Sequence, residues 1–163
     1  MSDSFEDRLK QAISRGENRA AAKEQAERAK AMTEEELKNL HSRYRLKVSD
    51  HIEECVGRLP GHFPGFQLKT IYGEKGWGAA CSRDDFAGGR GKGRASEYSR
   101  LEMTVRPFSK LHVLDLSAKG TIRNKEVFNR NHFKKLVDVD ESEFLRLVDV
   151  WVLEFAELYA AKI

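Results

Sequence analysis

The sequence predicts an α+β fold in which an antiparallel sheet of about five strands packs against a long N-terminal helix and a C-terminal helix. Apolar residues recur at helical spacing before the middle of the chain and again after it, whereas the middle alternates with a period of two. The order is helix, strands, helix, without alternation of single strands and helices. A dinucleotide-binding fold is therefore not expected.

The length and composition are those of one ordinary domain. A chain of 163 residues buries a core without help from disulfides or metals. Charged residues form 34% of the chain and the mean hydropathy is −0.62, which is typical of a soluble protein. No apolar run of about 18 residues and no export signal is found, so we expect a cytoplasmic protein without membrane contact. Cys55 and Cys81 lie in unlike contexts and predict no disulfide scaffold.

Residues 1–32 are predicted to form a polar helical extension. Residues 19–31 consist almost entirely of Ala, Glu, Lys, Gln and Arg, which are strong helix formers. No large apolar side chain occurs between Ile13 and Met32, so this segment offers little to a core. We expect it to project, to fray or to meet a second copy of the chain or another protein, while residues 33–163 form a single domain.

A core helix is predicted to begin at Thr33, because Thr33 and Glu36 have the spacing of a capping box. Apolar residues follow at steps of three and four until Pro60 ends the helix. They are Leu37, Leu40, Tyr44, Val48, Ile52, Val56 and Leu59. Lys47 interrupts a strict heptad, which favours packing on a sheet over a coiled coil and leaves both open.

The first strands are expected as a hairpin. Residues 67–72 and 77–81 alternate in polarity around a turn at residues 73–76 that contains two glycines. Residues 87–95 then interleave glycines with basic residues and contain no bulky apolar anchor, which predicts a flexible loop.

Three further strands are expected. Residues 97–106 alternate, with Ser99, Leu101, Met103 and Val105 on one face. Residues 111–116 carry apolar groups on both faces and predict a central strand that is covered on both sides. A turn at residues 119–120 leads into a strand at 121–128, and residues 129–132 predict a loop or bend.

A strong helix is expected at the end of the chain. Asp140 is placed to cap it, and a wide apolar face follows at helical spacing. That face consists of Phe144, Leu147, Val148, Trp151, Val152, Phe155, Leu158 and Tyr159. It predicts that the helix lies on the sheet.

Charge is distributed unevenly along the chain, although the net charge is only +3. Residues 90–135 contain twelve basic and four acidic side chains, whereas residues 136–163 contain two basic and seven acidic ones. The basic segment indicates either an anionic partner or neutralisation within the fold, for example by the acidic helix.

The basic segment supplies the candidate binding residues for an anion or another ligand. They are Arg90, Lys92, Arg94, Tyr98, Arg100, Arg106, Arg123 and Arg130, with Phe108, Phe128 and His132 near them. If five of them share the less covered face of the sheet, they form a cationic surface of the kind that binds single-stranded nucleic acid or RNA; these are Tyr98, Arg100, Arg106, Arg123 and Arg130. The alternative is pairing within the sheet, with Arg100 or Arg106 against Glu102 or Asp115.

No residue set predicts a catalytic, metal or cofactor site. His51 and Cys55 lie one helical turn apart with His62 beyond, but no second pair of ligands accompanies them, so neither a metal nor a cofactor is predicted. Ser99, His112 and Asp115 are of suitable types for hydrolysis but occur without a catalytic motif, so catalytic residues stay unassigned.

The sequence thus favours a non-catalytic cytosolic binding or assembly module that acts through its helices and a basic sheet surface. One alternative is nucleic-acid binding through residues 90–135. The other is a small enzyme or ligand-binding domain with a pocket under the C-terminal helix, where Trp151, Tyr98 and Arg100 meet a small anion.

Overall fold

The protein is an α+β structure of three α-helices, one 3-10 helix and five strands within the described residues. The computed structural model describes residues 2–86 and 96–162, without the side chains of residues 2, 3, 28–33, 86 and 162. In chain order the elements are α1 (Ser2–Val56), α2 (Leu59–His62), β1 (Gln67–Ile71), β2 (Trp77–Phe86), β3 (Ser96–Val105), β4 (Val113–Ile122), β5 (Lys125–Lys135), η1 (Leu136–Asp138) and α3 (Glu141–Lys162). They belong to two compact units, Met1–Lys38 and Asn39–Ile163.

Helix α1 runs from Ser2 to Val56 without interruption, so the predicted helix start at Thr33 is wrong. The reason is the composition of the preceding residues, which are strong helix formers up to Ala31. Carbonyl groups one turn earlier are therefore available to the amides at Thr33, and no free helix terminus is left to cap. The division of the chain at residue 33 stays a prediction.

The sheet is an antiparallel meander in the order β1-β2-β3-β4-β5, and the predicted fold class is confirmed. The first hairpin pairs Leu68 with Cys81 and lies where the sequence predicts it. Strand β2 continues beyond the predicted end at residue 81 to Phe86, and β3 pairs with it along ten residues. The predicted loop at residues 87–95 lies outside the described residues.

The hairpin of β4 and β5 differs from the sequence prediction. Strand β4 runs through residues 119–120 and the chain turns at Arg123 and Asn124, whose φ angles are 48° and 70°. Asn tolerates this left-handed conformation better than most residues. Gly120 is not a turn residue: a Cβ there would lie 2.9 Å from the Phe128 ring, so the glycine makes room for that ring. Residues 129–132, predicted as a loop, belong to β5.

Strand β4 is an interior strand, as predicted, but it is not covered on both faces. Leu114 and Leu116 are fully buried, whereas Val113 and Asp115 on the other face are only half-buried. Leu111 lies before the strand and is 77% exposed. The apolar residues of 111–116 therefore belong partly to β4 and partly to the segment that precedes it.

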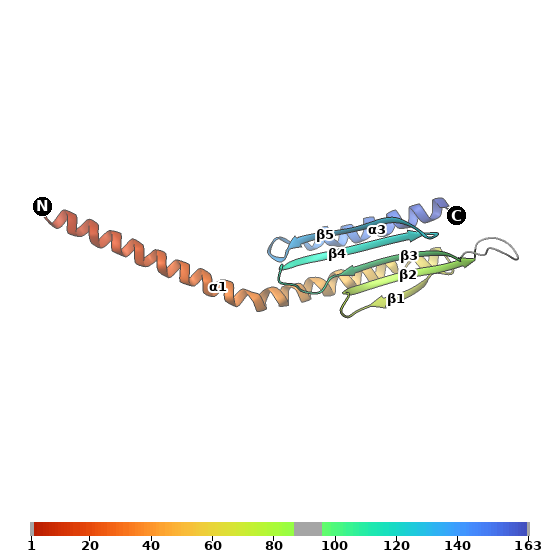
Figure 1. The fold of residues 1–163 in the computed structure, drawn as a ribbon, viewed down its shortest axis with the longest axis horizontal. Coiled ribbons are helices and arrows are strands. Elements are labelled where there is room, and N and C mark those ends of the chain that lie inside the picture. Colours follow the sequence, from red (N-terminus) through yellow and green to blue (C-terminus); the bar gives the residue numbers. More distant parts are fainter. Residues whose placement is uncertain (1, 87–95, 163) are drawn as a thin grey trace. The chain divides into compact units, whose positions relative to one another are not determined.

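Within the second unit, residues 39–56 of α1 and helix α3 cover the same face of the sheet (Figure 1). Val48, Ile52 and Val56 of α1 are fully buried, which confirms packing on a sheet for this part of the stripe. Phe144 and Phe155 of α3 are fully buried as well. Helix α3 begins where predicted, with the Ser142 amide donating to Asp140 Oδ1 at 3.1 Å.

Aromatic rings join α3 to the segment after α2. Phe63 and Tyr159 meet edge to face with 4.9 Å between ring centroids, and Phe66 and Tyr159 do so at 5.0 Å. Phe155 also packs edge-on against Phe66 at 6.3 Å. Such pairs add to the burial energy of the rings and fix the end of α1 beside α3.

Candidate functional site: a groove between α1 and α3

The predicted cationic residues do not share one face of the sheet. Tyr98 and Arg100 lie on the face opposite to the helices, since Ser99 and Leu101, which alternate with them along β3, are buried beneath the helices. Arg130 lies on the helix side, 4.5 Å from the Phe128 ring centroid. Arg123 is in the turn after β4. Arg90, Lys92 and Arg94 lie outside the described residues.

Each described arginine of this set has an acidic partner. Arg100 Nη2 lies 3.1 Å from Glu102 Oε1, and Arg106 Nε lies 3.9 Å from Asp115 Oδ2. Glu102 and Asp115 are the acidic partners that the sequence analysis names. The other two pairs are Arg123 with Glu97 at 3.5 Å and Arg130 with Glu154 at 2.8 Å. The last pair joins the basic segment to the acidic helix. Nucleic-acid binding through residues 90–135 stays a prediction, and these pairs do not favour it.

The anion pocket expected from Trp151, Tyr98 and Arg100 does not form. Trp151 is 6% exposed and lies on the helix side of the sheet, where its ring centroid is 5.8 Å from Arg130 Cζ. Tyr98 and Arg100 lie on the opposite face. A sheet therefore separates the tryptophan from the other two side chains.

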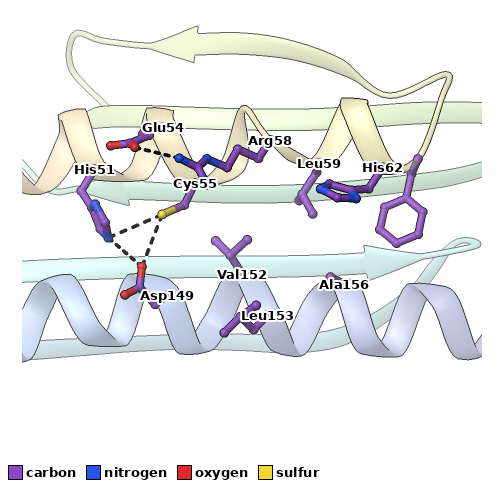
Figure 2. Close-up of a pocket in the computed structure, with 11 residues that line it drawn as sticks. His51, Glu54, Cys55, Arg58, Leu59, His62, Asp149, Val152, Leu153 and Ala156 are labelled. Carbon is purple, nitrogen blue, oxygen red and sulfur yellow. Dashed lines mark hydrogen bonds and ion pairs between the residues drawn. The ribbon is translucent and has the colours of Figure 1, made fainter.

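A cavity of about 620 Å³ lies instead between the end of α1, α2 and α3. The surface that its walls expose is mostly apolar, although six of the eleven lining side chains are polar, and Figure 2 shows it as a groove between the two long helices. The lining residues are His51, Glu54, Cys55, Arg58, Leu59, His62, Phe63, Asp149, Val152, Leu153 and Ala156. This size and composition are typical of small-molecule sites.

Three polar side chains converge at one end of the groove. His51 and Cys55 are four residues apart on α1, which places them one above the other on one face of the helix. Asp149 approaches from α3, which an ion pair between Lys47 and Glu141 at 3.3 Å also joins to α1. Figure 2 shows the three side chains pointing toward one another.

The three polar atoms are within contact distance. His51 Nε2 lies 2.7 Å from Asp149 Oδ1 and 3.5 Å from Cys55 Sγ, and Cys55 Sγ lies 3.4 Å from Asp149 Oδ1. With the imidazole proton on Nε2, both His51 and the Cys55 thiol donate to the same carboxylate oxygen. Burial, reinforced by this bond to Asp149, raises the pKa of Cys55 to about 12.

This arrangement is not that of a nucleophilic triad. A histidine that activates a thiol uses one ring nitrogen as base and the other to reach the orienting carboxylate. Here Nε2 alone faces both Cys55 and Asp149. The raised pKa also keeps the thiol protonated at neutral pH, and a thiol is a poor nucleophile.

Ser99, His112 and Asp115, the three residues of suitable types for hydrolysis, are not brought together either. Ser99 is buried on the helix side, and its Oγ accepts the Arg123 amide at 3.0 Å. Asp115 lies on the other face beside Arg106, which directly follows β3 and is seven residues beyond Ser99. At about 3.3 Å per residue, this separates them by roughly 20 Å along the sheet.

Asp149 is the functional candidate that sequence reasoning missed. It lies 94 residues from Cys55 in the sequence, on a helix where acidic side chains are common. Asp149 directly follows the buried Val148, which indicates only that it lies at the border of the apolar face of the helix. The spacing of His51 and Cys55 was a visible signal, but the third side chain depends on how the two helices pack.

Comparisons with known proteins assign no family: no family model, no curated protein and no solved structure matches the chain. Within the described residues, no helix combines the length and the apolar character needed to cross a membrane.

Proposed function

We propose that the chain is a non-catalytic binding module that holds a small amphipathic molecule in the groove between α1 and α3. The observation that carries the proposal is the groove itself, whose volume of about 620 Å³ falls in the range of small-molecule sites. Its walls combine apolar side chains with polar ones, of which His51, Cys55 and Asp149 converge at one end. A cytoplasmic location stays part of this proposal.

The dimensions of the groove favour a small molecule over a bound helix. Asp149 and Ala156 mark the extent of the groove on α3, and seven residues of helix span about 10 Å. This length accommodates an apolar body of about eight carbon atoms in extended form. The body would lie over Leu153 and Ala156, and the polar head would face His51, Cys55 and Asp149.

Apolar burial would provide most of the affinity. Leu153 is 66% exposed although it lines the groove, so a ligand that covers it removes apolar surface from water. Each square ångström of such surface contributes about 25 cal/mol. The polar end would then select the head group through hydrogen bonds.

The test is methyl NMR of the full chain during titration with two probes, 1-octanol and octanoate. They share one apolar body and differ in the charge of the head. Saturable shifts of the Leu153 and Ala156 methyl signals with either probe support the proposal. Ala156→Trp, which fills the groove, should abolish them.

Val150→Trp is the matched control, because Val150 lies on the same helix, is 49% exposed and does not line the groove. This variant should bind as the parent chain does, with helix content verified by circular dichroism. Absence of saturable shifts with both probes would reject the proposal, as would equal loss of binding in the two tryptophan variants.

A second candidate function is self-association through the start of α1. Phe5, Leu9 and Ile13 lie at steps of four on one face of the helix and are 63%, 42% and 53% exposed. Such a stripe at helical spacing is typical of a surface that packs against another helix. We propose a second copy of the same segment as its partner, because the same stripe offers a complementary apolar surface to itself.

Sedimentation equilibrium tests this second candidate. Changing Phe5, Leu9 and Ile13 together to Gln should shift a dimer toward the monomer. The matched control changes Asp7, Gln11 and Arg15 to Ser, since these residues face away from the stripe. A parent chain that stays monomeric at high concentration would exclude self-association.

A further inference from the structure

We infer that His51, Cys55 and Asp149 form a zinc-binding site at the polar end of the groove. The inference concerns the donor atoms themselves and does not depend on the proposed groove ligand. An imidazole nitrogen, a sulfur and a carboxylate oxygen are the three donor types that zinc takes from proteins. All three atoms lie within 4.8 Å of one another.

The separations between the donor atoms fit the edges of a zinc tetrahedron. With Zn–S of about 2.3 Å and Zn–N or Zn–O of about 2.0–2.1 Å, tetrahedral ligands lie about 3.3–3.6 Å apart. The distances from Cys55 Sγ to His51 Nε2 and to Asp149 Oδ1 are 3.5 Å and 3.4 Å. The remaining edge, from His51 to Asp149, is a 2.7 Å hydrogen bond. Zinc would replace the proton of that bond and widen the edge by about 0.6 Å.

Proton and charge balance are simple at this site. On binding, the Cys55 thiol loses one proton to solvent and becomes a thiolate. His51 stays neutral when its proton moves from Nε2 to Nδ1, and Asp149 is already a carboxylate. The two negative charges then offset the charge of Zn²⁺, so the bound site is neutral.

The elements that carry the ligands favour a defined geometry. His51 and Cys55 are held one turn apart on a helix whose neighbouring residues Ile52 and Val56 are fully buried. Asp149 follows Val148, which is fully buried on α3. The backbone positions of all three ligands are therefore fixed by the core, and only side-chain rotation is needed to receive the ion.

Three protein ligands leave the fourth position of a tetrahedral zinc open. His51, Cys55 and Asp149 all line the groove, so this position would face it and take water or the head group of a ligand. The combination of sulfur and imidazole selects zinc over Mg²⁺ and Ca²⁺, which prefer oxygen ligands only.

The experiment is cobalt substitution in the full chain, because Co²⁺ occupies zinc sites and reports its ligands by absorption. We expect the strong visible bands of four-coordinate cobalt and a thiolate-to-cobalt charge-transfer band in the near ultraviolet, both lost when zinc is added. Cys55→Ser should remove the charge-transfer band. Cys81→Ser, at a fully buried cysteine on β2, is the matched control and should retain it.

A second measurement keeps the inference testable if one variant fails to fold. Competition with a chelating indicator gives the zinc dissociation constant, which His51→Gln and Asp149→Asn should each raise by at least about 10–100-fold. His62→Gln, which lines the same groove away from the three ligands, should leave it unchanged. Weak six-coordinate cobalt bands without charge transfer, or equal zinc affinity in all variants, would overturn the inference.

Discussion

His41 is a buried histidine whose neutral form belongs to the folded state. Its side chain is 2% exposed, its Nε2 lies 3.1 Å from the Arg106 carbonyl oxygen, and its ring meets Phe108 edge to face. With the proton on Nε2, the ring donates to that carbonyl. Burial is the largest cause that lowers the pKa of His41 below its ordinary value of 6.5. The unfolded chain therefore binds more protons than the folded chain as the pH falls below 6.5.

This imbalance predicts that the free energy of unfolding decreases as the pH falls through 6.5 and continues to decrease until the lower folded-state pKa is reached. Urea unfolding at a series of pH values from neutral to mildly acidic measures it. His41→Gln should be less stable at neutral pH and should show a weaker pH dependence. An identical pH dependence of the unfolding free energy in the parent protein and in His41→Gln would show that His41 is not its cause.

Gly78 is required by the close approach of two backbones. A Cβ at this position would lie 2.0 Å from the Met103 carbonyl oxygen on the neighbouring strand. Gly78→Ala should therefore lower the free energy of unfolding by about 1–3 kcal/mol, the usual cost of overpacking. Gly61→Ala is the control, since nothing lies within 4 Å of its Cβ position, and it should change stability much less. Equal urea midpoints for the two variants would refute this explanation.

At the scale of elements, one side chain connects the β4–β5 turn to the start of β3. Asn124 Oδ1 accepts the Tyr98 amide at 2.9 Å, and its Nδ2 donates to the Ser96 carbonyl at 2.8 Å. Its φ of 70° also lies in the left-handed region. Asn124→Ala loses both bonds and adopts this conformation less readily, so we expect a destabilisation of about 1–3 kcal/mol in urea unfolding.

Asn124→Gly separates the two causes. Glycine loses the same side-chain bonds but adopts the left-handed conformation freely, so its stability should lie between those of the parent and the alanine variant. If the alanine variant were as stable as the parent, the side-chain bonds would contribute nothing to the turn.

The elements also show what sequence patterns predict. The apolar stripes of α1 and α3 are buried because helical periodicity reports one covered face directly. The β4–β5 hairpin was misplaced because Gly120 resembles a turn residue, whereas its role is to accept the Phe128 ring from the paired strand. Such cross-strand packing depends on register, which a single sequence does not contain.

At the scale of the whole molecule, the fully buried core belongs to one of the two units. Among the described side chains, every buried one lies between His41 and Tyr159. A chain of residues 39–163 should therefore unfold cooperatively, with the urea midpoint of the full chain. A large loss of stability, seen as a shifted midpoint or a non-cooperative transition, would show that residues 1–38 contribute to the core.

Only part of the candidate site was predictable from the sequence, because the rest depends on how distant parts of the chain pack together. His51 and Cys55 share a helix, so their proximity follows from their spacing alone. Asp149 and the groove walls on α3 join them through tertiary packing of two helices far apart in the sequence. The basic residues of 90–135 show the reverse case. Arg100 and Arg130 belong to one basic segment of the sequence, yet they lie on opposite faces of the sheet.

The most direct test of the account is X-ray absorption at the zinc edge of the full chain loaded with one equivalent of zinc. The convergence of His51, Cys55 and Asp149 predicts four-coordinate zinc with one sulfur at about 2.3 Å and nitrogen or oxygen ligands at about 2.0–2.2 Å. The sulfur contribution should vanish in Cys55→Ser. A six-coordinate shell of oxygen and nitrogen without sulfur in the parent chain would contradict the account.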